Sequence, residues 1–318
     1  MKVLGIIVGI VVLALLAAWL KLRGPDIPYA ALENKYADPQ SRFVDLPGGI
    51  HAHYQDDGDP ALPLLVLLHG FGDSFTSWEG WVKELKGRFH IISLDFPGHG
   101  LTRAPDGYVL HGDGLTEFVD AFAEKLALPK FALAGNSMGG GVAWRFALRH
   151  PQRLNALILV DAAGFPNEKP PAEVPLAFKI LKYPLGRAFL RNIDNRFLID
   201  EGLKTDVYDK ALITPALVDR WAEFQRAPGH RATLMSLNPG DFATASAEAL
   251  HGIDVPTLIL HGESDVLVEP ASAHKFAEAI PGARLILYPR VGHLPQIEIP
   301  QRSAADVAEF LHATGHSG

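Results

Sequence analysis

The stretch Gly135-Asn136-Ser137-Met138-Gly139 decides the fold, because it stands directly between a strand-like run and a helix-like run. It fits the pattern G-x-S-x-G, in which a serine lies on a sharp turn from a strand into a helix. Such a turn leaves no room for side chains two residues before and after the serine, and glycine stands at both places. The stretch therefore predicts an outward-pointing, nucleophilic hydroxyl on Ser137.

A serine hydroxyl becomes a good nucleophile when a base takes its proton and a carboxylate orients that base. Both partners are expected at later strand ends. Asp265 follows a strand-like run at 257–260, and His293 follows another at 284–288. Serine, acid and histidine then come in the chain order that enzymes with this turn use. We predict Ser137 as nucleophile, Asp265 as the orienting carboxylate and His293 as base.

Two other acids compete for the orienting role. Glu263 shares the loop with Asp265, and Asp161 ends an earlier strand. We prefer Asp265. Asp161 is a better rival than Glu263, because it stands at the end of a strand, where the geometry requires the orienting carboxylate. His69 also invites a catalytic role, but we interpret it as a buried histidine that braces its loop, since the base is already assigned.

The tetrahedral intermediate on a serine needs two N–H donors for its oxyanion. One is expected to be the backbone N–H of Met138, directly after the nucleophile. The other is expected from the loop His69-Gly70-Phe71-Gly72, where the residue after His-Gly turns its N–H inward. We predict Phe71 as this second donor.

Short apolar runs alternate with helical segments along most of the chain after residue 40. Near-continuous valine, isoleucine and leucine in these runs indicates strands that are covered on both faces. The alternation predicts an α/β fold with a mostly parallel central sheet flanked by helices. The expected strands are 62–68, 89–94, 131–134, 157–160, 256–260 and 284–288, and the expected helices include 114–128 and 303–311, the latter with Ser303 as N-cap.

The strand pattern stops after Asp161 and resumes at residue 256, and the residues between them read as helices with proline-rich breaks. We interpret this segment as a helical cap inserted into the sheet domain. The predicted organisation is a hydrophobic anchor at 1–23, the first part of the core at 24–164 with a linker at about 24–40, the cap at 165–250 and the second part of the core at 251–318.

The N-terminus carries no charged residue from position 3 to position 20. As a helix this stretch would be about 27 Å long, close to the thickness of the hydrocarbon core of a bilayer. A signal peptide is the alternative, but the apolar run is longer than usual and lacks a clean small-residue cleavage site. We predict a protein anchored in a bacterial inner membrane by a single N-terminal helix; cleavage would instead make it periplasmic or secreted.

The net charge is −7 at pH 7 and the sequence pI is about 6.0. Such a chain offers no basic field to hold nucleic acid. The absence of cysteine excludes disulfides, thiolate metal sites and a cysteine nucleophile. We therefore expect a small-molecule ester, lipid esters included, as the partner, and neither a metal nor an organic cofactor.

Five motifs stand in order within about residues 40–314. They are the His69 loop, Asp95-Phe96-Pro97-Gly98-His99-Gly100, the serine turn, the Asp265 loop and Gly292-His293. Together they resemble the α/β-hydrolase superfamily, which implies that fold and a serine hydrolase. With its apolar N-terminus, the chain is similar to the membrane-bound monoacylglycerol lipase and esterase branch. This resemblance implies cleavage of carboxylic esters, with apolar acyl groups or monoacylglycerol-like, through an acyl-enzyme on Ser137.

Two other functions stay open. Asn136-Ser137-Met138-Gly139-Gly140 and residues 212–221 also resemble meta-cleavage-product hydrolases, which cleave C–C bonds. Those enzymes usually carry tryptophan after the catalytic histidine and a longer glycine-rich oxyanion loop, whereas Leu294 and Phe71-Gly72-Asp73-Ser74 stand here. A non-catalytic binding protein on the same fold is the alternative of another class. The aromatic residues of the cap that are candidates for lining a pocket are Phe178, Phe189, Phe197, Trp221 and Phe224.

Overall fold

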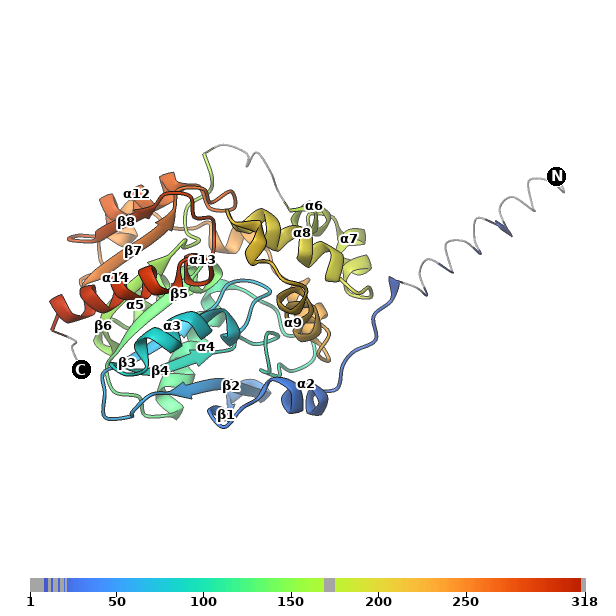
Figure 1. Cartoon of the computed structure of the whole chain (residues 1–318), viewed down its shortest axis with the longest axis horizontal. Coiled ribbons are helices and arrows are strands. Elements are labelled where there is room, and N and C mark those ends of the chain that lie inside the picture. Colours follow the sequence, from blue (N-terminus) through green and yellow to red (C-terminus); the bar gives the residue numbers. More distant parts are fainter. Residues whose placement is uncertain are drawn as a thin grey trace.

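A single twisted sheet forms the centre of the molecule (Figure 1). The computed structural model describes residues 22–168 and 175–315, together with positions 9, 10, 13, 17 and 20. Within these residues the sheet has eight strands in the order β1-β2-β4-β3-β5-β6-β7-β8. The strands are β1 Ser41–Leu46, β2 Ile50–Asp57, β3 Leu64–Leu68, β4 His90–Leu94, β5 Phe131–Asn136, β6 Leu154–Val160, β7 Thr257–Gly262 and β8 Arg284–Tyr288.

Strands β3 to β8 are all parallel to their neighbours, with Leu68 of β3 beside Gly135 of β5. Their carboxyl ends therefore meet at one edge of the sheet, where active sites of α/β proteins form. Strand β1 pairs antiparallel with β2, and β2 pairs antiparallel with β4. The mostly parallel sheet predicted from the apolar runs is confirmed, and β1 and β2 are additions that those runs did not indicate.

Helices cover both faces of the sheet (Figure 1). Alternate residues of β3 show the two layers, since Val66 packs in a cluster with α4, α5 and α12, whereas Leu65 packs in a cluster with α3 and α14. The helices are α2 Tyr29–Tyr36, α3 Glu79–Leu85, α4 Gly112–Lys125, α5 Met138–Arg149, α6 Leu176–Leu181, α7 Pro184–Leu190, α8 Arg196–Asp206, α9 Pro215–Gln225, α10 His230–Leu234, α11 Ala247–Leu250, α12 Pro270–Ala279, α13 Pro295–Glu298 and α14 Pro300–Ala313.

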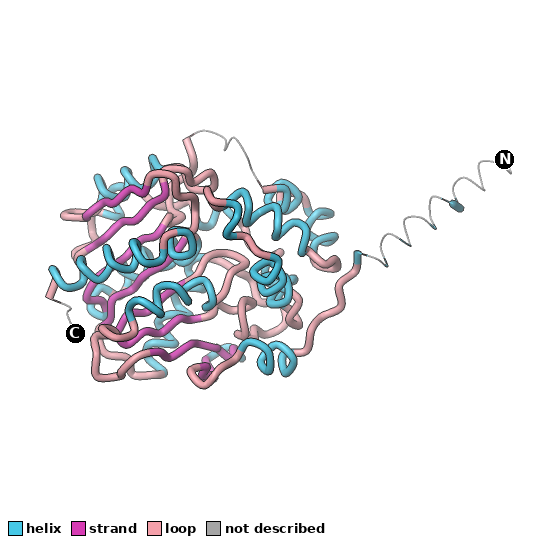
Figure 2. The backbone as a smooth tube through the Cα atoms, in the orientation of Figure 1, coloured by secondary structure: helices cyan, strands magenta, loops and turns pink. Residues whose placement is uncertain are grey.

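The chain leaves the sheet after β6 and returns at β7, although these two strands are hydrogen-bonded neighbours. Between them lie α6 to α11, and Figure 2 shows helices and loops, without a strand, in the described part of this segment. Helices α6 to α9 form a separate group beside the carboxyl edge of the sheet (Figure 1). We keep the name cap for residues 165–250, and the exact division into domains stays a prediction.

The N-terminal anchor requires a correction. A spanning helix needs about 20 apolar residues to cross about 30 Å of hydrocarbon, but the longest helices described, α4 and α14, have 14 residues each. No helix in the described residues is both long and apolar enough to cross a membrane. This finding overturns the predicted localisation at a bacterial inner membrane. Most of residues 3–20 lie outside the described residues.

Two local predictions also differ from the structure. The expected linker at 24–40 contains α2, which buries Leu32 against Phe75 and Phe224. Ser303 is not an N-cap, because α14 begins at Pro300. The Ser303 hydroxyl is buried inside the helix and accepts a hydrogen bond from the indole Nε1 of Trp81 at 2.8 Å.

Candidate active site

Ser137 occupies a strained turn between β5 and α5. Its backbone has φ 54° and ψ −116°, a region that residues with side chains rarely adopt. A Cβ atom at Gly135 would collide with the carbonyl oxygen of Gly139, and one at Gly139 would collide with the carbonyl oxygen of Leu68. The two glycines therefore let the helix approach the sheet closely enough to hold the serine at its edge.

Asp265 and His293 form a buried pair at the same edge. The Nδ1–H of His293 donates to Oδ2 of Asp265 at 2.6 Å, and both side chains are almost completely buried. The other carboxylate oxygen accepts the backbone N–H groups of Leu267 at 2.8 Å and Val268 at 3.0 Å. With Asp265 held from both sides, the proton of His293 stays on Nδ1 and Nε2 is left as the basic atom.

Ser137 and His293 line one cavity of about 120 Å³ together with Phe71. The structure therefore brings the predicted nucleophile, the predicted base and one predicted oxyanion donor to the same space. Most of the lining is apolar and comes from the cap. These apolar residues are Pro175, Ala177, Phe178, Leu181, Leu190, Leu198, Ile199, Leu203, Trp221, Leu234 and Met235, with Leu267 and Leu294 from the core.

The loop that carries His293 is fastened by two residues that the sequence analysis did not assign. The amide Nδ2 of buried Asn136 donates to the carbonyl oxygens of His293 at 3.1 Å and Val160 at 3.2 Å. The backbone N–H of His293 donates to the carbonyl oxygen of Asp206, the last residue of α8, at 2.6 Å. Asn136 stands at a variable position of the serine motif, and no local pattern marks Asp206.

The electrostatics of the site favour a protonated histidine. Burial alone would lower the pKa of His293, but the carboxylates of Asp265, Asp161 and Asp206 outweigh it and raise that pKa to about 9. Burial would likewise raise the pKa of Asp265, but the positive charge of His293 and the hydrogen bonds to Asp265 lower it. The pair is thus arranged to stabilise an imidazolium beside a carboxylate.

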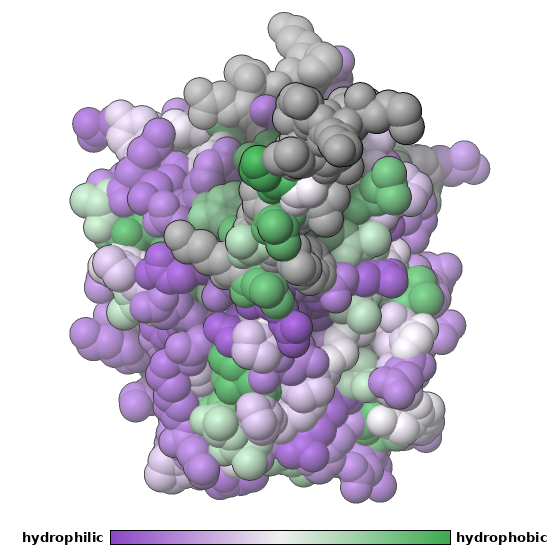
Figure 3. All heavy atoms as spheres, turned by 90° about the vertical axis from the view of Figure 1, so that its right-hand side faces the viewer, coloured by the Kyte–Doolittle hydropathy of each residue, from purple (hydrophilic) through white to green (hydrophobic). Residues whose placement is uncertain are grey.

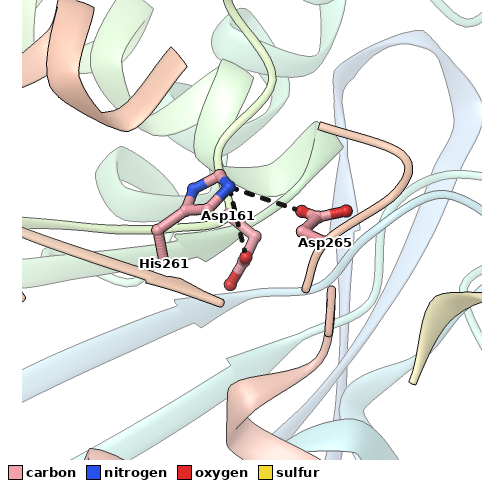
Figure 4. A group of neighbouring side chains, drawn as sticks. All are labelled: Asp161, His261 and Asp265. Atoms are coloured by element: carbon pink, nitrogen blue, oxygen red, sulfur yellow. Dashed lines mark ion pairs between the residues drawn. The ribbon is translucent and has the colours of Figure 1, made fainter. Parts of the chain in front are cut away.

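Asp161, the rival acid, lies with Asp265 beside the ring of His261 (Figure 4), whereas the hydrogen bond from Nδ1 of His293 goes to Asp265. It follows β6 with φ 44°, is fully buried, and accepts the N–H of Gly262 at 2.9 Å through Oδ1. Its Oδ2 has no hydrogen-bond partner within the described residues. Burial and the neighbouring charge of Asp265 raise the pKa of Asp161 well above its usual range.

His261 stands between these two acids, and its Nε2 is 3.6 Å from an oxygen of each (Figure 4). In the described part of the chain, Asp161, His261 and Asp265 form the group whose candidate ligand atoms are close enough to share a metal ion. Two of the three residues have other partners, since Nε2 of His261 donates to the carbonyl oxygen of Val268 at 2.9 Å and Asp265 accepts a hydrogen bond from His293, whereas Oδ2 of Asp161 has none in the described residues.

The predicted oxyanion donors come from two segments, the start of α5 and the loop after β3. Met138 is the first residue of α5, so its N–H is one of those that a helix leaves without an internal partner. Phe71 lines the cavity. His69 is fully buried, and its Nε2 accepts the N–H of Phe96 at 3.0 Å while Nδ1 donates to the carbonyl oxygen of Gly70 at 2.7 Å. His69 therefore braces the Phe71 loop.

Two further acids line the cavity, and the sequence analysis did not assign a role to either. Burial raises the pKa of Asp73 to about 8 and that of Asp206 to about 7. Each has one buried carboxylate oxygen without a hydrogen-bond partner in the described residues. Asp73 could have been suspected from its place directly after the Phe71-Gly72 loop, whereas Asp206 comes from the distant end of a cap helix.

The cap aromatics separate into three groups. Phe178 and Trp221 line the cavity. Phe224 is buried in a small core with Leu32 of α2. Phe189 and Phe197 are 39% and 51% exposed on the outside of the cap. Figure 3 views the side of the molecule that carries the cap, and its visible surface has small hydrophobic groups separated by hydrophilic residues.

Comparison with known proteins gives consistent matches. The model of the alpha/beta hydrolase fold family matches residues 63–300. The 2-hydroxymuconate semialdehyde hydrolase of Pseudomonas sp. (strain CF600) is 28% identical over 280 residues, which cover 84% of this chain and 92% of that protein. The pimeloyl-[acyl-carrier protein] methyl ester esterase of Nitrosomonas europaea is 31% identical over 246 residues, covering 76% of this chain and 92% of that protein.

A solved structure is similar over the same region. A variant of the meta-cleavage product hydrolase CumD superposes with a TM-score of 0.74 at 26% sequence identity. The match covers 86% of this chain and 98% of that one. The fold class predicted from the sequence is confirmed by these matches.

Proposed function

We propose that this chain, which belongs to the α/β-hydrolase family, cleaves carboxylic esters through an acyl-enzyme on Ser137. One observation carries the proposal. Ser137 stands at the strained turn before α5 and faces the same cavity as His293, whose ring is hydrogen-bonded to buried Asp265. A nucleophile and a base in one cavity, with a buried acid that orients the base, are the parts that acyl transfer needs.

In the proposed reaction, Nε2 of His293 takes the hydroxyl proton of Ser137 while the serine oxygen attacks the ester carbonyl. The N–H groups of Phe71 and Met138 hold the oxyanion, each contributing on the order of 3 kcal/mol. The imidazolium then gives its proton to the leaving alcohol as the C–O bond breaks. Water attacks the acyl-enzyme by the same route and releases the carboxylic acid.

The cavity supports a short, apolar acyl group. Its volume of about 120 Å³ is comparable with a cavity of roughly 150 Å³ that takes one benzene molecule. The apolar side chains of the cap and the ring of Phe178 would contact such a chain. The esterase from Nitrosomonas europaea, which is 31% identical, supports the choice of an ester bond.

Hydrolysis of a C–C bond is the second candidate. It is favoured by the similarity to 2-hydroxymuconate semialdehyde hydrolase and to a meta-cleavage product hydrolase. Against it stands Leu294 at the position after His293, where the resemblance to meta-cleavage-product hydrolases implies tryptophan. The two reactions use the same serine and histidine, so only substrates can separate them.

We expect p-nitrophenyl esters of graded acyl length to be hydrolysed, with kcat/KM highest for acetyl to butyryl chains and falling for longer ones. A dienoic meta-cleavage substrate, assayed beside them by loss of its absorbance, should be turned over much more slowly. The full-length protein serves both assays. Faster turnover of the dienoic substrate would replace the ester proposal by C–C hydrolysis.

The raised pKa of His293 gives the activity a specific pH dependence. Only the neutral ring accepts the serine proton, so kcat/KM for an uncharged ester should rise with pH until the histidine is deprotonated, with an apparent pKa above 6.5 and not above about 9. Asp206→Asn removes a negative charge that stabilises the imidazolium. The rising limb of the profile should then move to lower pH by roughly half a unit to one unit. An unshifted limb would show that Asp206 does not act on the base.

A further inference from the structure

The carboxylate of Glu298 joins the cap to the loop that carries His293. Glu298 is the last residue of α13, and its Oε1 accepts the backbone N–H of Gly292 at 2.7 Å. Its Oε2 accepts the N–H of Tyr208 at 2.8 Å and that of Asp209 at 3.3 Å. Gly292 precedes the predicted base, whereas Tyr208 and Asp209 follow cap helix α8. One side chain therefore accepts hydrogen bonds from both segments.

The same two segments are in direct contact beside this bridge. The N–H of His293 donates to the carbonyl oxygen of Asp206 at 2.6 Å. A Cβ atom at Gly292 would collide with that carbonyl oxygen and would lie 2.9 Å from the Cα of Val207, so the backbones touch. Leu294 packs in one apolar cluster with Leu203 and other cap residues. Residues of the cap therefore contact His293 and the residues directly before and after it, Gly292 and Leu294.

A carboxylate suits this position for a chemical reason. Three backbone N–H groups converge on Glu298, and two oxygens with a full negative charge can accept all three. A glutamine side chain has only one acceptor oxygen. Its NH₂ group is a donor and would face a backbone N–H that is also a donor, so no hydrogen bond could form there. Glu298 is half-buried, so an N–H group left without an acceptor there would be costly.

We propose that Glu298 is a positioning residue that couples the cap to the catalytic loop, holding Gly292 and His293 against residues 206–209. The proposal rests on the function proposed above for Ser137 and His293. In this arrangement the helix that supplies one wall of the substrate cavity also sets the place of the base. Loosening the bridge displaces His293 from the serine, which slows acyl transfer more than it weakens binding of a small ester.

The test compares Glu298→Gln with wild type and with a control variant, Glu309→Gln. Glu309 lies on α14, and its replacement breaks an exposed ion pair with Arg284 of β8. For Glu298→Gln we expect kcat for acetyl and butyryl esters to fall by about tenfold, with KM changed by less than about twofold. The rate of covalent labelling of Ser137 by a fluorophosphonate should fall in parallel. Glu309→Gln should leave kcat, KM and labelling unchanged.

Hydrogen exchange distinguishes coupling from a local role. In folded Glu298→Gln, checked by its melting temperature, peptides that contain residues 206–209 and peptides that contain residues 291–293 should both lose protection. If kcat falls but only the histidine loop loses protection, the coupling to the cap is wrong. If neither peptide changes and kcat is retained, the bridge itself has no role. Should wild type hydrolyse no ester, labelling and exchange still report on Ser137 and on the bridge, so this failure is separable from failure of the proposed function.

Discussion

Replacing Ser137 by alanine is expected to abolish ester hydrolysis, lowering kcat by on the order of 10⁵ to 10⁶. The reason is that His293 and Asp265 have no bond-forming atom to activate once the hydroxyl is gone. Covalent labelling by a fluorophosphonate should disappear as well. Both measurements use purified full-length protein at equal concentrations, with circular dichroism to show that the fold is retained.

A matched control for this variant is Ser272→Ala. Ser272 is fully buried in α12, and its hydroxyl has no hydrogen-bond partner in the described residues, so alanine fits its place. This control should keep both turnover and labelling. Undiminished labelling of Ser137→Ala would mean that another residue is the nucleophile, and the assignment built on the serine turn would be lost.

Replacing Asp265 by asparagine is expected to lower kcat by on the order of 10³ to 10⁴. An amide can donate its N–H to Nδ1 of His293, which forces the ring proton onto Nε2. Nε2 then has no free lone pair with which to accept the serine proton. Asp161→Asn should have little effect by comparison. The hydrogen bond from Nδ1 of His293 goes to Asp265, whereas Oδ1 of Asp161 accepts the N–H of Gly262, and the oxygen of an amide can accept the same hydrogen bond.

The contrast between the two variants decides the acid. Measuring kcat of both with the same acetyl ester, across the pH range of the wild-type profile, removes any difference caused by a shifted histidine pKa. A large loss in Asp161→Asn with a small loss in Asp265→Asn would place the orienting carboxylate after β6.

The sheet and the residues at its carboxyl edge could be predicted because their signals are local. Each buried parallel strand is a continuous apolar run, and the turn at Ser137 needs glycines at fixed distances, so both appear in a short stretch of sequence. Asp265 and His293 follow such strands, and the parallel topology alone brings them to one edge. This is why the structure finds them hydrogen-bonded although they come from different loops.

Other features depend on contacts that no short stretch encodes. Strand β1 has mixed residues and is defined by pairing with β2, not by an apolar run. Asp206 and Glu298 matter through backbone groups of distant segments, and a backbone carbonyl or N–H leaves no mark in the sequence. The membrane anchor is predicted from the length and hydropathy of residues 3–20, and no helix in the described residues is long and apolar enough to cross a membrane.

The return of the chain to β7 directly beside β6 has an evolutionary consequence. The ends of the cap segment are fixed by neighbouring strands, about 4.8 Å apart in a sheet, whatever lies between them. Lengthening such a detour costs little, since each doubling of a loop adds only about 0.6 kcal/mol of closure entropy. The cap can therefore diverge, shrink or be exchanged among descendants while the hydrolytic machinery is inherited intact. Gly292 and Glu298 lie where the cap contacts the core, so substitutions at these positions are expected to be tolerated less well than substitutions within the cap.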